Sequence, residues 1–178
     1  MSVDYRSAVI FVKDMGASRR FYEDLMEQEL EFDFGANVSY VGGLALWQVD
    51  RAHEVVFASP SEDGAPSVDG APSVDGAPSA GVGQGELELY FETDDLDAVV
   101  KLFEEAGVTF VHPLREQPWG QRVIRVYDPD GHIVEVGEPI PVFVARFLAQ
   151  GLSEEETAER TSVPLEAVRQ IAGATGCR

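Results

Sequence analysis

The hydrophobic and polar positions of the chain follow the same order twice. Residues 8–26 (AVIFVKDMGASRRFYEDLM) and residues 89–107 (LYFETDDLDAVVKLFEEAG) align at an offset of 81, which pairs Asp14 with Asp95. Each half starts with a short apolar strand and, after the aspartate, continues as an amphipathic helix that the aspartate can cap. In the second helix the apolar positions recur every three to four residues, at Leu96, Val99, Val100 and Phe103. Such an internal match indicates a duplicated unit.

Three strand-like segments follow each helix. In the first half they are LEFDFG (30–35), NVSYVG (37–42) and GLALWQVD (43–50). In the second half they are GVTFVHPL (107–114), QRVIRVYD (121–128) and HIVEVGE (132–138). Their alternating pattern is typical of a sheet that a helix covers on one face. We therefore predict an α+β fold in which two βαβββ modules form a cupped sheet.

The alternation in ELELYFE (86–92) also predicts which side chains face the helix. Leu87, Leu89 and Phe91 should pack beneath the helix of the second half. Glu86, Glu88, Tyr90 and Glu92 should then face the opposite, concave side. This places carboxylates and a tyrosine where a ligand has access.

The chain divides into four segments by composition. Residues 1–58 form the first module and residues 86–140 the second. Residues 59–85 contain three copies of a DGAPSV-like hexapeptide, whose Asp-Gly, Pro and small residues favour a flexible linker. Residues 141–178 predict a small extension of three short helices that resembles a helix-turn-helix, with Ser153 and Glu156 as a capping box and Pro164 in a first turn.

Charge and composition limit the partners of the protein. The 178 residues carry a net charge of -19, which repels phosphate backbones, and the predicted C-terminal helices hold more glutamates than arginines. We therefore do not expect nucleic acid as a partner, although a helix-turn-helix can bind DNA. No apolar run approaches the roughly 20 residues that cross a bilayer. Cys177 is the only cysteine, and a cytoplasmic location is the default expectation.

Three motifs lie in order on the duplicated scaffold: FYEDLM (21–26), PWGQR (118–122) and DPDGHIVEV (128–136). With them, the chain resembles the vicinal oxygen chelate superfamily over residues 5–50 and 86–138. That superfamily includes glyoxalase I, extradiol dioxygenases, fosfomycin-resistance enzymes and the bleomycin-resistance binding proteins. The resemblance implies that paired modules curl their strands into a cup. It also implies that metal ligands come from the first and last strands of each module.

The resemblance assigns four ligand slots in this sequence. Ser7 and Glu88 occupy the first-strand slots and Glu135 the last-strand slot of the second module, while Trp47 or Gln48 occupies the remaining slot, depending on register. Two carboxylates without a histidine suit Mg²⁺ or Mn²⁺ better than Zn²⁺ or Ni²⁺. An Fe(II) dioxygenase is disfavoured because its two histidines are missing. Alternatively, Glu88 and Glu135 share a proton and act in acid–base catalysis without a metal.

Other residues predict the lining of a pocket. Trp119 can form its wall, and Arg122 can pair with an anionic group of a ligand. Tyr90, Trp47 and Gln48 are further candidates for contact with the ligand. The alternative is that Trp119 simply packs on the rim of the cup.

Two functions follow from these expectations. In the first, Glu88 and Glu135 hold a divalent ion (Mg, Mn, Zn or Ni) that polarises a substrate carbonyl, which is lyase or isomerase chemistry like that of lactoylglutathione lyase. In the second, the protein binds or sequesters a small organic molecule without a metal and without catalysis. The resemblance and the apolar segment VFVARFL (142–148) also predict a homodimer.

Overall fold

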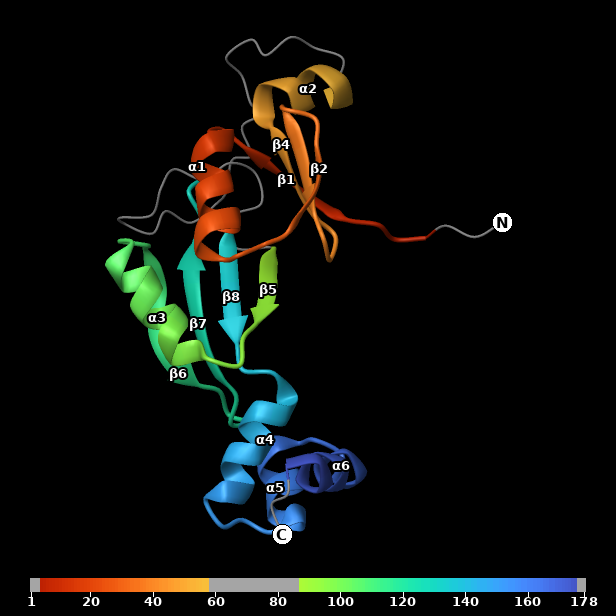
Figure 1. The fold of residues 1–178 in the computed structure, drawn as a ribbon, viewed down its shortest axis with the longest axis vertical. Coiled ribbons are helices and arrows are strands. Elements are labelled where there is room, and N and C mark those ends of the chain that lie inside the picture. Colours follow the sequence, from red (N-terminus) through yellow and green to blue (C-terminus); the bar gives the residue numbers. More distant parts are fainter. Residues whose placement is uncertain (1–3, 58–86, 176–178) are drawn as a thin grey trace, which may run out of the picture. The chain divides into compact units, whose positions relative to one another are not determined.

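The computed structural model describes residues 4–57 and 87–175 (Figure 1). The linker predicted at 59–85 lies outside these residues. The chain divides into two compact units, Met1–Leu87 with Asp128–His132, and Glu88–Tyr127 with Ile133–Arg178. The turn between the last two strands of the second module therefore belongs to the first compact unit.

The first module forms a four-stranded sheet in the order β1-β4-β3-β2. Its strands are β1 (Ala8–Val12), β2 (Leu30–Asp33), β3 (Asn37–Tyr40) and β4 (Leu44–Gln48), and only the β1–β4 pair among them is parallel. The helix after β1 begins as α1 (Met15–Arg19) and continues as the π-helical turn η1 (Arg20–Leu25). The buried side chains of this module come from the strands and the helix. They include Ile10 and Val12 of β1, Val38 of β3, Leu46 of β4 and Tyr22 of η1.

The second module repeats this topology in the order β5-β8-β7-β6. Its elements are β5 (Glu88–Glu92), α3 (Leu96–Glu105), β6 (Phe110–Glu116), β7 (Arg122–Tyr127) and β8 (Ile133–Gly137). Again the first and last strands pair in parallel and the remaining pairs are antiparallel. The predicted α+β fold of two βαβββ modules is confirmed.

Helix caps at equivalent positions show how closely the two halves match. The carboxylate of Asp14 accepts a hydrogen bond from the backbone N–H of Ala17 at 2.9 Å. In the second half, Asp95 accepts one from Ala98 at 3.0 Å. Both pairs are related by the offset of 81, so over the first strand and the helix the sequence alignment of the two halves is also the structural one.

The predicted alternation holds in β5 with one exception. Leu89 is buried, as are Leu96 and Phe103 of α3, whereas Glu88 and Tyr90 are exposed. Leu87 was expected beneath the helix but is 53% exposed, because it precedes the strand and belongs to the other compact unit. A helix that we did not predict, α2 (Val49–Phe57), follows β4 directly and buries Ala52.

The turn Asp128–His132 is held by its first aspartate. Asp128 is buried, and its carboxylate accepts hydrogen bonds from the backbone N–H groups of Asp130 and His132. The Tyr22 hydroxyl also donates to Asp128 Oδ2 at 2.9 Å, and His132 Nδ1 lies 2.9 Å from the same oxygen. Burial alone would lower the pKa of His132, but the carboxylates of Asp128 and Asp130 outweigh it and raise that pKa. The turn is thus a structural element that contacts η1.

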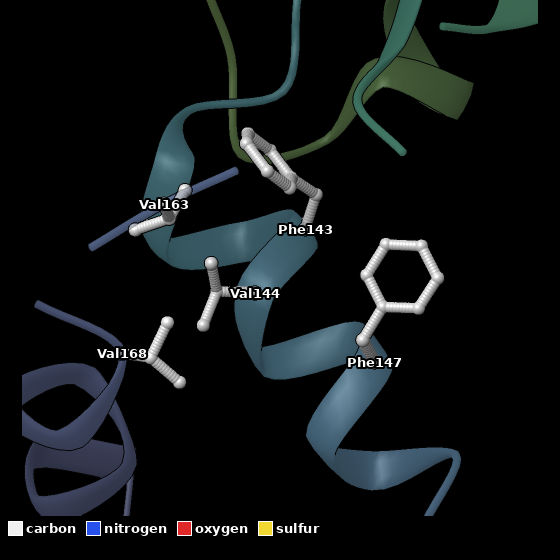
Figure 2. Packing of buried hydrophobic residues seen from close by; sticks show 5 residues of the cluster. All are labelled: Phe143, Val144, Phe147, Val163 and Val168. Atoms are coloured by element: carbon white, nitrogen blue, oxygen red, sulfur yellow. The ribbon is translucent and has the colours of Figure 1, made fainter. Parts of the chain in front are cut away.

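Three helices complete the chain: α4 (Ile140–Ala149), α5 (Glu154–Thr161) and α6 (Leu165–Thr175). The predicted capping box is present, with Ser153 and Glu156 bonded reciprocally. Within the VFVARFL segment, Phe143, Val144 and Phe147 form a buried cluster with Val163, before α6, and Val168 of α6 (Figure 2). The homodimer expected from this segment stays a prediction. Within residues 4–57 and 87–175, no helix has both the length and the apolar character needed to span a membrane.

Candidate functional site

The second sheet carries a row of polar side chains on the face opposite α3. Tyr90 on β5 is the register partner of Glu135 on β8, which in turn is the partner of Arg125 on β7. Glu88 lies two residues before Tyr90 and therefore points to the same face. Strand parity thus brings Glu88 and Glu135 to one surface, as the alternation predicted.

Arg125 lies between these two carboxylates. Its Nε atom is 2.5 Å from Glu88 Oε2, and its Nη2 atom forms an ion pair with Glu135 Oε2. The side chain of Glu135 is only 8% exposed, and its Oε2 meets no described group in hydrogen-bond geometry. The contact with the guanidinium is therefore what compensates the buried charge.

His112 completes the surroundings of Arg125. Its Nδ1 atom is 2.8 Å from the carbonyl of Pro113, and its Nε2 atom is 3.2 Å from Arg125 Nη1. A carbonyl only accepts and a guanidinium only donates, so these two partners suit the tautomer with the proton on Nδ1. Arg125 thus contacts Glu88, Glu135 and His112.

A second chain of hydrogen bonds crosses the same face. The indole N–H of Trp119 donates to Gln121, whose amide donates to the Tyr90 hydroxyl at 2.8 Å, and that hydroxyl donates to Glu92 at 3.0 Å. Gly137 leaves room for the Gln121 side chain in this series of hydrogen bonds, because a Cβ at position 137 would lie 2.9 Å from the Gln121 amide nitrogen. Trp119 and Tyr90 remain 43% and 48% exposed, so both present aromatic surface to a ligand.

Arg122 is engaged elsewhere. Its Nε atom donates to the buried carboxylate of Glu138 at 2.7 Å, and its Nη1 atom contacts Asp97. Arg146 on α4 donates to the same Glu138 at 3.0 Å. We had expected Arg122 to pair with an anionic ligand group, but its guanidinium contacts Asp97 of α3 and shares Glu138 with Arg146 of α4. The cation of the polar face is Arg125.

The first module offers no matching set. By the offset of 81, Tyr90 corresponds to Val9, whose register partner is Ala45. The residue equivalent to Glu135 is therefore Ala45, and neither Trp47 nor Gln48 occupies that slot as we had predicted. Trp47 packs edge-on against Phe11, and Gln48 donates to the Lys13 carbonyl at 2.6 Å. Ser7 lies just before β1 and is half-buried.

Sequence reasoning missed Arg125 and His112, although a signal for Arg125 existed. Tyr127 and Ile133 flank the DPDGH turn and pair with each other. Counting two residues back and forward from this pair sets Arg125 opposite Glu135. Arginine is not a metal ligand, so the ligand spacing of these strands gives no indication of Arg125.

Comparison with known proteins shows the family to which the chain belongs. Residues 5–141 match the family model described as a glyoxalase-like domain. The chain belongs to the glyoxalase-like domain family. A protein of unknown function from Agrobacterium tumefaciens str. C58 is 32% identical, covers 79% of this chain and 97% of its own, and has a TM-score of 0.63. A comparison with curated proteins finds no match.

Two more solved structures share the fold of this glyoxalase-like protein. A lactoylglutathione lyase from Agrobacterium tumefaciens is 23% identical, covers 77% of this chain and 94% of its own, and has a TM-score of 0.51. A member of the glyoxalase/bleomycin resistance protein/dioxygenase superfamily from Sphaerobacter thermophilus DSM 20745 is 25% identical, covers 78% and 98%, and has a TM-score of 0.50. Membership of the vicinal oxygen chelate superfamily, predicted from the motifs, is confirmed.

The donor set of the polar face does not fit a divalent metal ion. Both carboxylates of the predicted metal site contact the guanidinium of Arg125, a permanent cation. The one histidine nearby directs its lone pair at the same guanidinium. Within the described part of the chain, no three His, Cys, Asp or Glu side chains are grouped so that they could hold a metal.

Proposed function

We propose that this glyoxalase-like protein binds a small organic molecule on the face formed by Tyr90, Trp119, Glu88, Glu135 and Arg125, and that it does so without a metal. The two aromatic side chains supply exposed apolar surface, and the charged row supplies a few polar groups at fixed positions. Small-molecule sites commonly combine apolar lining with a small number of oriented polar groups. Binding or sequestering is therefore the function that we infer.

The observation that carries the proposal is the contact of one guanidinium with both carboxylates. A divalent ion between Glu88 and Glu135 would have to displace Arg125 or lie beside it. The repulsion between a dication and a guanidinium at contact distance is on the order of several kcal/mol near a protein surface. Arg125 takes the role of counter-ion that a metal would otherwise have.

The metal-dependent lyase is the alternative that this arrangement disfavours. The structure named lactoylglutathione lyase supports the fold of this chain, but its identity of 23% does not transfer its activity. Lyase chemistry of that kind needs a Lewis acid beside the substrate, and here the two carboxylates face a cation that cannot accept an oxygen ligand.

Metal titration tests the absence of a metal site. We expect chelator-treated wild-type protein to bind no stoichiometric Mg²⁺, Mn²⁺, Ni²⁺ or Zn²⁺ by calorimetry. Arg125→Ser should bind Mn²⁺ at least about tenfold more tightly, because two carboxylates lose their cation. Arg169→Ser is the matched control, since Arg169 also pairs with two glutamates, Glu154 and Glu155, on an exposed surface. One equivalent of metal in the wild type, lost in Glu135→Gln, would instead support the lyase.

A thermal-shift screen with a library of small organic molecules tests binding itself. We expect at least one compound to raise the melting temperature, since a ligand that binds only the folded state stabilises it. The shift should be lost in Trp119→Leu and in Arg125→Ser. It should persist in Trp47→Phe, which changes the other tryptophan, outside this face. A hit that keeps its full shift in Trp119→Leu and Arg125→Ser would place the ligand elsewhere and contradict the proposal.

A further inference from the structure

The loop that carries Trp119 and Gln121 joins β6 to β7. It is closed by hydrogen bonds of 2.8 Å from Gly120 N to Gln117 O and from Gln117 N to Gln121 O. Gly120 has a positive φ of 90°, a conformation that side chains other than glycine rarely adopt. The position of Trp119 on the polar face is therefore set by a tight turn.

The C-terminal helices hold this turn from outside the sheet. A Cβ on Gly120 would lie 2.3 Å from the ring of Phe147, so the loop backbone rests directly on that ring. Figure 2 shows the Phe147 ring on the far side of α4 from Val168. Phe147 is a member of the buried helical cluster and also contacts the loop, whereas Val168 lies on the other side of α4.

Two arginines reinforce this contact at backbone carbonyls of the same loop. Arg146 on α4 donates to the carbonyl of Gly120 at 2.5 Å, and Arg160 on α5 donates to the carbonyl of Pro118. Both guanidiniums also pair with Glu116 at the end of β6. The Cζ atoms of Arg146 and Arg160 lie 4.9 and 5.1 Å from the centroid of the Phe147 ring. The carbonyls on both sides of Trp119 are thus held by helices outside the βαβββ module.

We propose that the C-terminal helices are a clamp that positions Trp119 and Gln121 on the polar face. The helices resemble a helix-turn-helix in sequence, yet their arginines point to the loop and to glutamates. Phe147 and Arg160 are positioning residues, since neither belongs to the polar face itself. The effect on ligand affinity rests on the proposed function, whereas the positioning of Trp119 does not.

Tryptophan fluorescence tests the clamp without any ligand. In a Trp47→Phe background, Trp119 is the one remaining tryptophan of the chain. Phe147→Ala and, separately, Arg160→Gln should shift its emission to longer wavelength and increase its quenching by acrylamide, because the loop is released. Val168→Ala is the matched control: it removes buried volume from the same helical cluster without touching the loop, and should leave both values unchanged.

The outcomes separate the clamp from the binding function. Unchanged Trp119 emission and quenching in both Phe147→Ala and Arg160→Gln would overturn the clamp, as would an equal change in Val168→Ala. If the screen yields a ligand, Arg160→Gln should weaken its affinity by about tenfold, a loss typical of one displaced anchor residue. If the screen yields none, the change in Trp119 fluorescence still decides the clamp.

Discussion

Replacement of Arg125 with methionine should lower the free energy of unfolding by about 2–4 kcal/mol. The change leaves two carboxylates on one sheet face without their shared cation. Glu88, with 38% of its side chain exposed, can turn to water, but Glu135, with 8%, remains buried and unpaired. Most of the loss therefore comes from Glu135. Urea denaturation at neutral pH, followed by circular dichroism, measures it.

Two further variants test whether this loss of stability comes from the unpaired charge of Glu135. In Arg125→Met/Glu135→Gln the buried carboxylate is neutral, so part of the stability should return, and the double-mutant cycle should give a favourable coupling. Arg115→Met, at an exposed arginine of β6 in the same sheet, should change stability by less than about 0.5 kcal/mol. An Arg125→Met protein as stable as Arg115→Met would mean that the contact with both carboxylates does not exist in solution.

Replacement of Glu138 with leucine should cost about 3–4 kcal/mol. Its carboxylate is 1% exposed and accepts hydrogen bonds from Arg122 Nε, from the Arg122 backbone N–H and from Arg146. Leucine would leave all three donors without their acceptor at the junction of β7, β8 and α4. Glu138→Gln keeps an acceptor and should cost less. Thermal and urea unfolding of the two variants gives the comparison.

The contribution of Glu138 should also depend on pH. Burial alone would raise the pKa of this carboxyl, but the bonds from Arg122 and Arg146 together lower it below its ordinary value of 4.5. A folded-state pKa below the unfolded one gives stability that is fully present above 4.5 and is lost as the pH falls through the folded value. The stability difference between wild type and Glu138→Gln should therefore shrink in acid. A difference that stays constant would contradict this ion-pair network.

Local patterns were enough to predict the frame of the fold. The strands, the capping aspartates Asp14 and Asp95 and the Ser153 capping box each depend on residues close in sequence, and each is present. The helix α2 was missed because its apolar residues continue those of β4, and the strand pattern hid the change of period at Val49. Where a helix follows a strand directly, the hydrophobic period alone does not show where the strand ends and the helix begins.

The polar face was harder to predict because its partners are distant in sequence. Glu88 and Arg125 are separated by 37 residues, and Arg122 finds Glu138 at a separation of 16 and thereby loses its availability for a ligand. Strand parity gave the directions of Glu88, Tyr90 and Glu135 correctly. It did not tell which opposite charges meet, since this depends on the register between strands.

The repeated pairing of the first and last strands gives the second module a reference within the same chain. The β1–β4 pair has the same frame and cap as β5–β8 but carries Val9 and Ala45 where the second half carries Tyr90 and Glu135. The scaffold is thus stable with either an uncharged or a charged version of this surface. The β1–β4 pair therefore shows which uncharged residues the same strand pairing accepts, and it can guide substitutions that change what the second half recognises.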